Sequence, residues 1–271
     1  MKLTNKEFIK TLEKKYTFEK NPSVAVAVSG GPDSMSLLFL VYAFIKYRKG
    51  NLIALIVNHN IRNNSKEEAK SISAYLEKNK INSKILTVYK DNVSKKSMNE
   101  ARNNRYNLLS KFCSKNNILH LFIAHHKDDN LETFLNRKIA GSDFYGLKSI
   151  SEFSFYNKVC VMRPLLSFSK NTLLNYNKKN KIKCVNDPTN LNLDYARPAI
   201  RSFLNNSEQK TIKEINKDFD NILFYSPFFI QMIFEILLKH IVYIDRNKIV
   251  VNLKNIKKLN EITSENIIRR I

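Results

Sequence analysis

Residues 24–34 constrain the fold of this chain more than any other segment. Residues 24–28 alternate valine with alanine, which is typical of a short buried strand in a parallel sheet. Ser-Gly-Gly-Pro-Asp-Ser follows at 29–34, and the apolar run 35–47 is long enough for a helix. A helix start carries unpaired N–H groups and partial positive charge, and glycines let a ligand approach the backbone. The segment therefore predicts a strand, a tight loop and a helix around a phosphate group.

Two common kinds of phosphate loop do not fit this segment. The P-loop of NTPases ends in Gly-Lys-Ser/Thr, and the dinucleotide fingerprint has three spaced glycines. The pattern Ser-Gly-Gly-x-Asp-Ser instead resembles the PP-loop of the ATP pyrophosphatase superfamily, whose members cleave ATP between its α and β phosphates. The alternative is an ordinary helix start at which Asp33 or Ser34 acts only as a cap.

The charge of the chain indicates a polyanionic partner. The formal net charge is +22 and the sequence pI is about 9.8, and such a balance favours nucleic-acid binding. A general bias toward Lys, Asn and Ile would produce the same charge without any RNA partner. Arginine is scarce and falls mostly near the motifs described below, and its planar fork suits phosphate. The arginines therefore support phosphate chemistry more specifically than the net charge does.

Cysteine usage and hydropathy indicate a cytoplasmic chain. The three cysteines, Cys113, Cys160 and Cys184, are far apart and form neither a zinc spacing nor a disulfide framework. Residues 1–16 read as an amphipathic surface helix rather than a signal peptide. The apolar segment 222–238 is interrupted by polar residues and a proline, so we expect no membrane span.

The first half of the chain alternates predicted strands and helices. Strands are expected at 24–28, 52–57, 84–88 and 120–124, with helices at 65–79, 97–116 and 128–140. This alternation predicts an α/β fold with a doubly wound, mostly parallel sheet. Ligands bind at the carboxyl ends of such strands, which brings the loops at 29–34, 58–62 and 125–129 to one edge. We expect a catalytic domain at 1–205 and a small, mostly helical C-terminal region at 206–271.

Further motifs follow the glycine loop in a fixed order. They are Val-Asn-His-Asn-Ile-Arg at 57–62, Glu-Ala-Arg-Asn-Asn-Arg-Tyr at 100–106, Ala-His-His-Lys-Asp-Asp-Asn-Leu-Glu-Thr at 124–133, Arg-Pro-Leu-Leu at 163–166 and Asp-Pro-Thr-Asn at 187–190. Together they resemble the tRNA(Ile)-lysidine synthetase family over roughly residues 23–201. The late arginine pair departs from the family pattern, because Pro198 stands where asparagine usually follows the first arginine.

This resemblance implies an ATP-dependent ligase that forms a carbon–nitrogen bond, built on an adenine-nucleotide-alpha-hydrolase-like PP-loop domain. The wobble cytidine of the CAU-anticodon isoleucine tRNA is adenylated at its C2 oxygen, with release of pyrophosphate. The ε-amine of free L-lysine then displaces AMP, and the resulting lysidine makes the tRNA read AUA. ATP as substrate and Mg²⁺ are implied, no membrane is expected, and the oligomeric state stays open, with a homodimer as one option.

The resemblance and the residue chemistry together assign roles to individual side chains. The departing pyrophosphate needs cationic and N–H stabilisation, which loop amides, Mg²⁺ and two arginines on one helix face can supply. We expect catalysis by Asp33, Arg102, Arg105, His125 and Asp128; ATP binding by Ser29, Gly30, Gly31, Pro32, Asp33, Ser34 and His59; lysine binding by Asp129 and Glu132; tRNA binding by Arg137, Arg163, Arg197 and Arg201; and Mg²⁺ binding by Asp33.

The acidic cluster at 125–132 has other interpretations. Acidic residues at a helix start stabilise the helix dipole, which accounts for Asp128 but less well for Glu132. His125, His126 and Asp129 are zinc-ligand types, although adjacent histidines point apart and no cysteine completes the set. One histidine could instead serve as a general base.

Three rival functions remain. A PP-loop enzyme that inserts sulfur into tRNA cytidine generally needs paired cysteines. An amide-forming synthetase for a small metabolite needs no strong positive charge and often carries a glutaminase domain. An RNA-binding protein without activity explains the charge but leaves residues 29–34 and 125–132 without a role.

Overall fold

The computed structural model describes residues 3–58, 65–88, 98–185, 196–245, 248–256 and 258–268. These residues fold into two compact units. One contains the described residues of Met1–Asn130 and Ser151–Asn192, and the other those of Leu131–Ile150 and Leu193–Ile271. The sequence predicts a single division after residue 205, whereas these units divide the chain at three points, the first of them within helix α5 (Lys127–Ile139).

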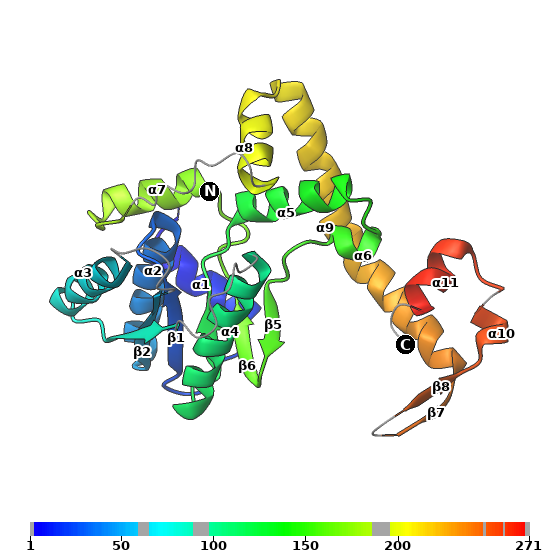
Figure 1. Cartoon of the computed structure of the whole chain (residues 1–271), viewed down its shortest axis with the longest axis horizontal. Coiled ribbons are helices and arrows are strands. Elements are labelled where there is room, and N and C mark those ends of the chain that lie inside the picture. The colour runs from blue at the N-terminus through cyan, green and yellow to red at the C-terminus, as the bar shows by residue number, and fades with distance from the viewer. Residues whose placement is uncertain are drawn as a thin grey trace. The chain divides into compact units, whose positions relative to one another are not determined.

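The first unit is built on a mostly parallel sheet (Figure 1). Its strands, among the described residues, are β1 (Ser23–Val28), β2 (Asn51–Asn58), β3 (Ser83–Thr87), β4 (His120–Phe122), β5 (Phe153–Tyr156) and β6 (Val159–Met162). Their order in the sheet is β3-β2-β1-β4-β6-β5, and only the β5–β6 pair is antiparallel. The predicted α/β fold class is therefore confirmed.

Helices cover both faces of this sheet because side chains on its strands alternate between two cores. Val24, Val26 and Val28 face one core, which also contains side chains from the helices of that face. Ala25 belongs to the opposite core, which includes residues of a single long helix. The first face carries α1 (Asn5–Lys15), α2 (Pro32–Arg48), α3 (Ser65–Lys78) and α7 (Lys170–Lys179), and the second carries α4 (Met98–Lys115).

The strand register brings two of the predicted loops to one edge of the sheet. Val28 at the end of β1 pairs with Ile56 of β2, and Val26 pairs with Phe122 at the end of β4. The loop after β1 and the segment after β4 therefore leave the sheet on the same side. The loop after β2, at 59–64, lies outside the described residues.

The β5–β6 hairpin was not predicted from the sequence. Its strands are only four residues long, and β5 lies at the edge of the sheet. On β5 the aromatic side chains of Phe153 and Phe155 are exposed rather than buried. A short edge strand with apolar residues on its open face does not show the buried pattern of a central strand.

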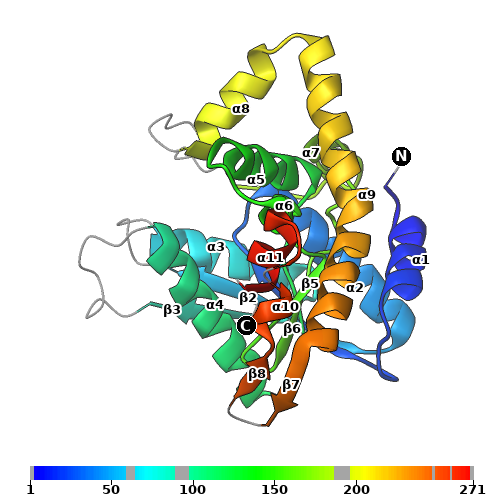
Figure 2. The same ribbon diagram turned by 90° about the vertical axis from the view of Figure 1, so that its right-hand side faces the viewer.

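The second unit is mostly helical, which confirms the predicted helical C-terminal region (Figure 2). Its apolar core includes Phe134 and Leu135 of α5, Ile200 and Phe219. Beyond α5, its elements in the described residues are α6 (Phe144–Leu147), α8 (Ala196–Asn206), α9 (Gln209–His240), β7 (Ile241–Ile244), β8 (Ile249–Val251), α10 (Leu253–Ile256) and α11 (Glu261–Ile268).

Helix α9 is unusually long and apolar. It runs for 32 residues with Pro227 inside it, and it exposes the aromatic side chains of Phe224, Tyr225, Phe228 and Phe234. Among the described helices, it is the one long and apolar enough to cross a membrane, with a mean hydropathy of 1.6 over its most apolar window. Length and composition are the whole of that criterion, and a single such helix is weak support for a membrane span.

Candidate nucleotide site

The loop between β1 and α2 has the geometry of a phosphate cradle. Gly30 has φ +83°, a left-handed conformation that favours glycine. Gly31 is the N-cap of α2, and Pro32 follows at the first helical position, where its missing N–H costs nothing. The Ser34 hydroxyl accepts a hydrogen bond from the Ser29 N–H at 3.2 Å and donates one to the Gly31 carbonyl at 2.9 Å. The loop is therefore held closed by its own serines, with the helix start directed at its mouth.

A pocket of about 370 Å³ opens beside this loop, on the α4 face of the sheet. This volume is in the range of small-molecule sites. Residues of β1, β2, the glycine loop, the start of α2, helix α4 and the segment after β4 meet there. Its lining comprises Ala27, Val28, Ser29, Gly31, Asp33, Ser34, Leu55, Val57, Arg105, Leu109, Ile123, Ala124 and His125.

Next to the loop, His126 is surrounded by carboxylates. Its ring is buried, and its Nε2 lies 3.6 Å from an Asp33 oxygen and 3.4 Å from an Asp129 oxygen. Its Nδ1 lies 3.4 Å from an Asp128 oxygen. Burial lowers the pKa of His126, but hydrogen bonds to Asp128 and Asp33 outweigh it and raise the pKa to about 9. At neutral pH the imidazolium therefore neutralises part of the acidic cluster.

Helix α7 supplies a second cationic group to this cluster. The Lys170 N–H at the start of α7 donates to an Asp128 oxygen at 2.8 Å, and the Lys170 Nζ lies 3.7 Å from an Asp33 oxygen. Burial raises the pKa of Asp128, but the bonds from His126 and the Lys170 N–H outweigh it and lower the pKa below its usual value. Asp128 thus stays ionised while it joins α7 to α5.

Asp129 also shapes the start of α5. Its carboxylate accepts a hydrogen bond from the His126 N–H at 3.1 Å, so it satisfies a donor at the helix terminus. This is the helix-start role considered for the acidic cluster. Asp129 has this role in addition to its contact with the His126 ring, and both are compatible with substrate binding.

The side chains here suit a Mg²⁺ ion that binds together with a phosphate ligand better than a metal ion held by protein side chains alone. Mg²⁺ commonly binds through one or two carboxylates together with substrate phosphates, and Asp33 combines a carboxylate with a place in the pocket lining. Among the residues that the structure describes, no group of three or more His, Cys, Asp and Glu side chains is arranged to hold a metal ion. Asp33 therefore fits an ion carried in with a phosphate ligand.

The predicted arginines take different positions. Arg105 lines the pocket, whereas Arg102, one turn earlier on α4, lies over the Tyr106 ring at 5.2 Å. Arg163 is buried and donates to the Ser151 carbonyl at 3.0 Å, so it holds the segment that leads into β5. Arg137 donates to the Gly146 carbonyl and so closes the loop after α5. RNA contacts by Arg137 and Arg163 stay predictions, alongside these roles in the fold.

In the second unit, Glu132 is paired with Arg201. Glu132 is 3% exposed, and its carboxylate accepts two hydrogen bonds from the Arg201 guanidinium, one of them at 3.1 Å. This bidentate geometry joins α5 to α8. The predicted lysine-binding carboxylate is thus already engaged by a cation.

Several predicted features lie outside the described residues. They are His59, the motif at 187–190 and the side chain of Arg197.

Three important side chains were missed from the sequence. The sequence presents His126 as one histidine of a possible zinc set or a possible general base, and Lys170 resembles any other lysine of a lysine-rich chain. Asn177 of α7 donates to the Pro32 carbonyl and accepts from Ser36, each at 2.8 Å, and so supports the loop from behind. A polar residue inside an apolar helix face, such as Ser36, is the one sequence signal that could have indicated this contact.

The fold and the site together define a class: an α/β protein with a glycine loop at the end of its first strand whose geometry suits a phosphate group. Comparison with known families makes this specific. The chain belongs to the PP-loop domain family, which matches residues 3–208.

Curated relatives share this domain. The chain is 42% identical over 194 residues to a tRNA(Ile)-lysidine synthase from Wolbachia sp. subsp. Brugia malayi. The aligned region covers 71% of this chain and 45% of that relative. It is 34% identical over 212 residues to a tRNA(Ile)-lysidine synthase from Mycoplasma mycoides subsp. mycoides SC, with coverage of 76% of the chain and 52% of that relative. The chain thus spans about half the length of the curated relatives it matches.

A solved structure shares the fold. The U34-tRNA thiolase NcsA from Methanococcus maripaludis, determined with its [4Fe-4S] cluster, matches with a TM-score of 0.64 at 20% identity. The match covers 80% of this chain and 79% of that one. Identity at this level shows a common fold.

Proposed function

We propose that this chain is a tRNA(Ile)-lysidine synthetase, which joins lysine to the wobble cytidine of a CAU-anticodon isoleucine tRNA. The observation that carries the proposal is one pocket in which the Ser29–Ser34 loop, Arg105 and His125 converge beside a cluster of carboxylates. Its support is the similarity to relatives that bear this name and the match to the PP-loop domain family, whose range 3–208 contains the pocket. As a further part of the proposal, the protein acts in the cytoplasm.

In the first step, the C2 oxygen of cytidine attacks the α-phosphorus of ATP, and the bond to the β-phosphate oxygen breaks. Pyrophosphate leaves with the bonding electrons, so negative charge develops at the β-phosphate. Loop amides at the α2 start, Arg105 and Lys170 are the proposed groups that stabilise this charge. Gly30, Gly31 and Pro32 let the phosphates approach the backbone, with Ser29, Ser34 and His59 as further ATP contacts.

When bound with ATP, Mg²⁺ would be held by Asp33 and the phosphates, and it would supply charge neutralisation there. His126 and Lys170 both contact the Asp33 carboxylate. In this proposal they orient that carboxylate toward the phosphates.

In the second step, the neutral ε-amine of lysine attacks C2, and the C2–O bond breaks to release AMP. The amine must first lose a proton, for which His125, at the pocket wall, is the proposed acceptor. Asp129 and Glu132 are the proposed carboxylates for the lysine substrate. Because Arg201 already engages Glu132, lysine binding to Glu132 would share or replace that contact.

The tRNA is bound by basic side chains in this proposal. Arg137, Arg163, Arg197 and Arg201 are proposed to contact RNA, and Arg102 keeps its proposed catalytic role. No specific observation favours the cytidine thiolase: the similarity to the U34-tRNA thiolase shows the fold alone, and the three cysteines are spread over buried and half-buried sites.

The test is a transfer assay with the full chain. Protein, ATP, Mg²⁺, labelled lysine and a CAU-anticodon isoleucine tRNA transcript are incubated, and label in RNA is measured with the nucleotide products. The proposal predicts lysine in the RNA, together with AMP and pyrophosphate. Formation of ADP, or RNA without lysine, would overturn it.

A further inference from the structure

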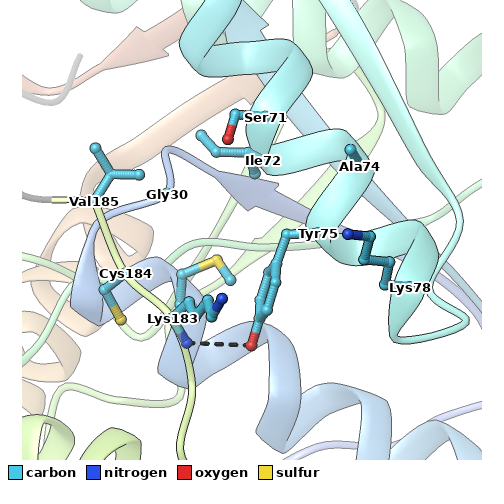
Figure 3. A pocket seen from close by; sticks show the side chains of 10 residues that line it. Gly30, Ser71, Ile72, Ala74, Tyr75, Lys78, Lys183, Cys184 and Val185 are labelled. Carbon is cyan, nitrogen blue, oxygen red and sulfur yellow. Dashed lines mark hydrogen bonds between the residues drawn. The ribbon is translucent and has the colours of Figure 1, made fainter.

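A second pocket lies behind the glycine loop, on the opposite face of the sheet from the nucleotide site. Its volume is about 420 Å³, and it is open between α3 and residues 183–185 (Figure 3). Its apolar floor includes Met35 and Ile72, which belong to the core of the α2 and α3 face. Gly30 lines this pocket, whereas its neighbours Ser29 and Gly31 line the nucleotide site. The two pockets are therefore separated by the same loop.

The pocket has a fixed aromatic wall. The Tyr75 hydroxyl accepts a hydrogen bond from the Lys183 N–H at 3.1 Å, drawn as the dashed line in Figure 3. The Tyr75 ring also packs against Phe39 of α2, with centroids 6.4 Å apart. These contacts hold the ring in place before any ligand arrives, and the hydroxyl still carries a proton that it can donate. A preorganised aromatic ring is a stacking surface for a planar ligand.

The charges around the pocket select an anion. Of its ten lining residues, all in the described part of the chain, two are lysines and none is acidic. Lys78 comes from α3 and Lys183 from the opposite wall, and both are exposed. Such a pair would repel an amino acid's ammonium group and attract a phosphate. Apolar floor, aromatic wall and paired lysines together match a nucleobase that carries a phosphate.

Binding here would act on the glycine loop directly. The Val185 N–H donates to the Gly30 carbonyl at 2.9 Å, and Val185 lines the pocket beside Lys183. An added Cβ at Gly30 would lie 2.5 Å from the Ile72 side chain, so the loop and the pocket floor are in close contact. A ligand held between Ile72 and Val185 would therefore restrict the loop that forms the nucleotide site.

From this geometry we propose that the pocket behind the glycine loop binds a single-stranded nucleotide of the RNA substrate, with its base against Tyr75 and its phosphate between Lys78 and Lys183. The proposal rests on the proposed function for the presence of RNA. The strong positive charge of the chain, +22, favours an RNA strand as the source of this nucleotide over a free mononucleotide.

The test compares two double variants that remove equal charge. K78Q/K183Q alters the pocket, and K70Q/K179Q removes exposed lysines of α3 and α7 that do not line it. Affinity for a CAU-anticodon stem-loop RNA is measured at fixed salt. We expect K78Q/K183Q to weaken binding about tenfold more than the control, and Y75A to weaken it by at least about fivefold. In the transfer assay, K78Q/K183Q should raise KM for RNA more than K70Q/K179Q does.

Cross-linking locates the nucleotide independently of these variants. The same RNA carrying 4-thiouridine should cross-link to the peptide that contains residues 71–78. Equal affinities for the two double variants, with no cross-link to that peptide, would overturn the inference. Dependence of uridine monophosphate binding on Lys78 and Lys183, with RNA affinity unchanged, would also overturn it, because the site would then take a free nucleotide. Cross-linking without any lysine transfer would support the pocket and contradict the proposed function instead.

Discussion

Two cations hold the carboxylate of Asp33 at the mouth of the nucleotide site. His126, directly before α5, and Lys170 of α7 both contact it, so the charge of Asp33 is balanced by groups that the sequence separates widely. This arrangement keeps several ionised side chains close together beside the pocket that is proposed to bind ATP. The balance of charge around Asp33 therefore depends on the protonation of His126.

The raised pKa of His126 predicts how stability varies with pH. A group whose pKa is higher in the folded protein contributes stability that is complete below its unfolded pKa, near 6.5, and is lost as pH rises through about 9. The free energy of unfolding of wild type minus that of His126→Asn should therefore fall over this pH window. Denaturant titrations in EDTA measure it, with His240→Asn as the control histidine in α9. A difference that is constant with pH would contradict the assigned charge.

Glu132 has a predicted role in lysine binding and also forms a structural ion pair with Arg201. Breaking a buried pair commonly costs about 3–5 kcal/mol. Because the Arg201 side chain is 34% exposed, we expect Glu132→Gln to lose roughly 1–3 kcal/mol of unfolding free energy. At a temperature where the variant stays folded, KM for lysine should rise more than pyrophosphate release falls. Equal losses in both steps would show that Glu132 acts only through the fold.

At the scale of elements, the loop between β1 and α2 depends on one glycine. Gly30→Ala would place a Cβ against Ile72 at a positive φ, and such strain costs roughly 1–3 kcal/mol. Gly141 is a matched control, since it has φ +67° and nothing within 4 Å of an added Cβ. Both variants should be less stable in thermal unfolding, but only Gly30→Ala should lose pyrophosphate release, by about tenfold or more. Equal activity of the two variants would contradict the role of the loop.

The sequence predicted the elements that have strong local signals. The buried valine-rich strand before Ser29 was located to within a few residues, because burial on both faces leaves a continuous apolar run. The amphipathic helices were located as closely, because apolar residues recur on one face with the period of a helix. The β5–β6 hairpin and the unbroken passage of α9 through Pro227 were not predicted. A helix normally bends or ends at proline, and the packing that keeps α9 continuous involves residues distant in the sequence.

Part of the candidate site could likewise be predicted from the sequence, and part could not. The glycine loop could be read directly, because its spacing and residue types carry the chemistry. The contacts of Lys170 with Asp33 and of Asn177 with Pro32 join positions more than a hundred residues apart. Only the packing of α7 against α2 brings them together, and the one sequence signal of it is Ser36, a polar residue inside an apolar helix face.

At the scale of the whole molecule, the excess of basic residues is large and mostly lysine. The chain carries 46 Lys and Arg against 24 Asp and Glu, and each neutralised phosphate releases a counterion. We therefore expect RNA affinity to fall steeply with salt, with a slope of log K against log salt of about −4 or steeper. A salt titration with a stem-loop RNA measures this, and a flat slope would contradict binding through diffuse lysine contacts.

In the proposed reaction, the wobble cytidine is activated at its C2 oxygen by the α-phosphate of ATP. A tRNA transcript with ¹⁸O at C2 of the wobble cytidine tests it directly, with mass spectrometry of the released AMP. Because the C2–O bond breaks when lysine enters, the account predicts one ¹⁸O in the phosphate of AMP for each lysine incorporated. Asp33→Ala should form neither product. Unlabelled AMP, with the ¹⁸O retained in the RNA, would contradict the account.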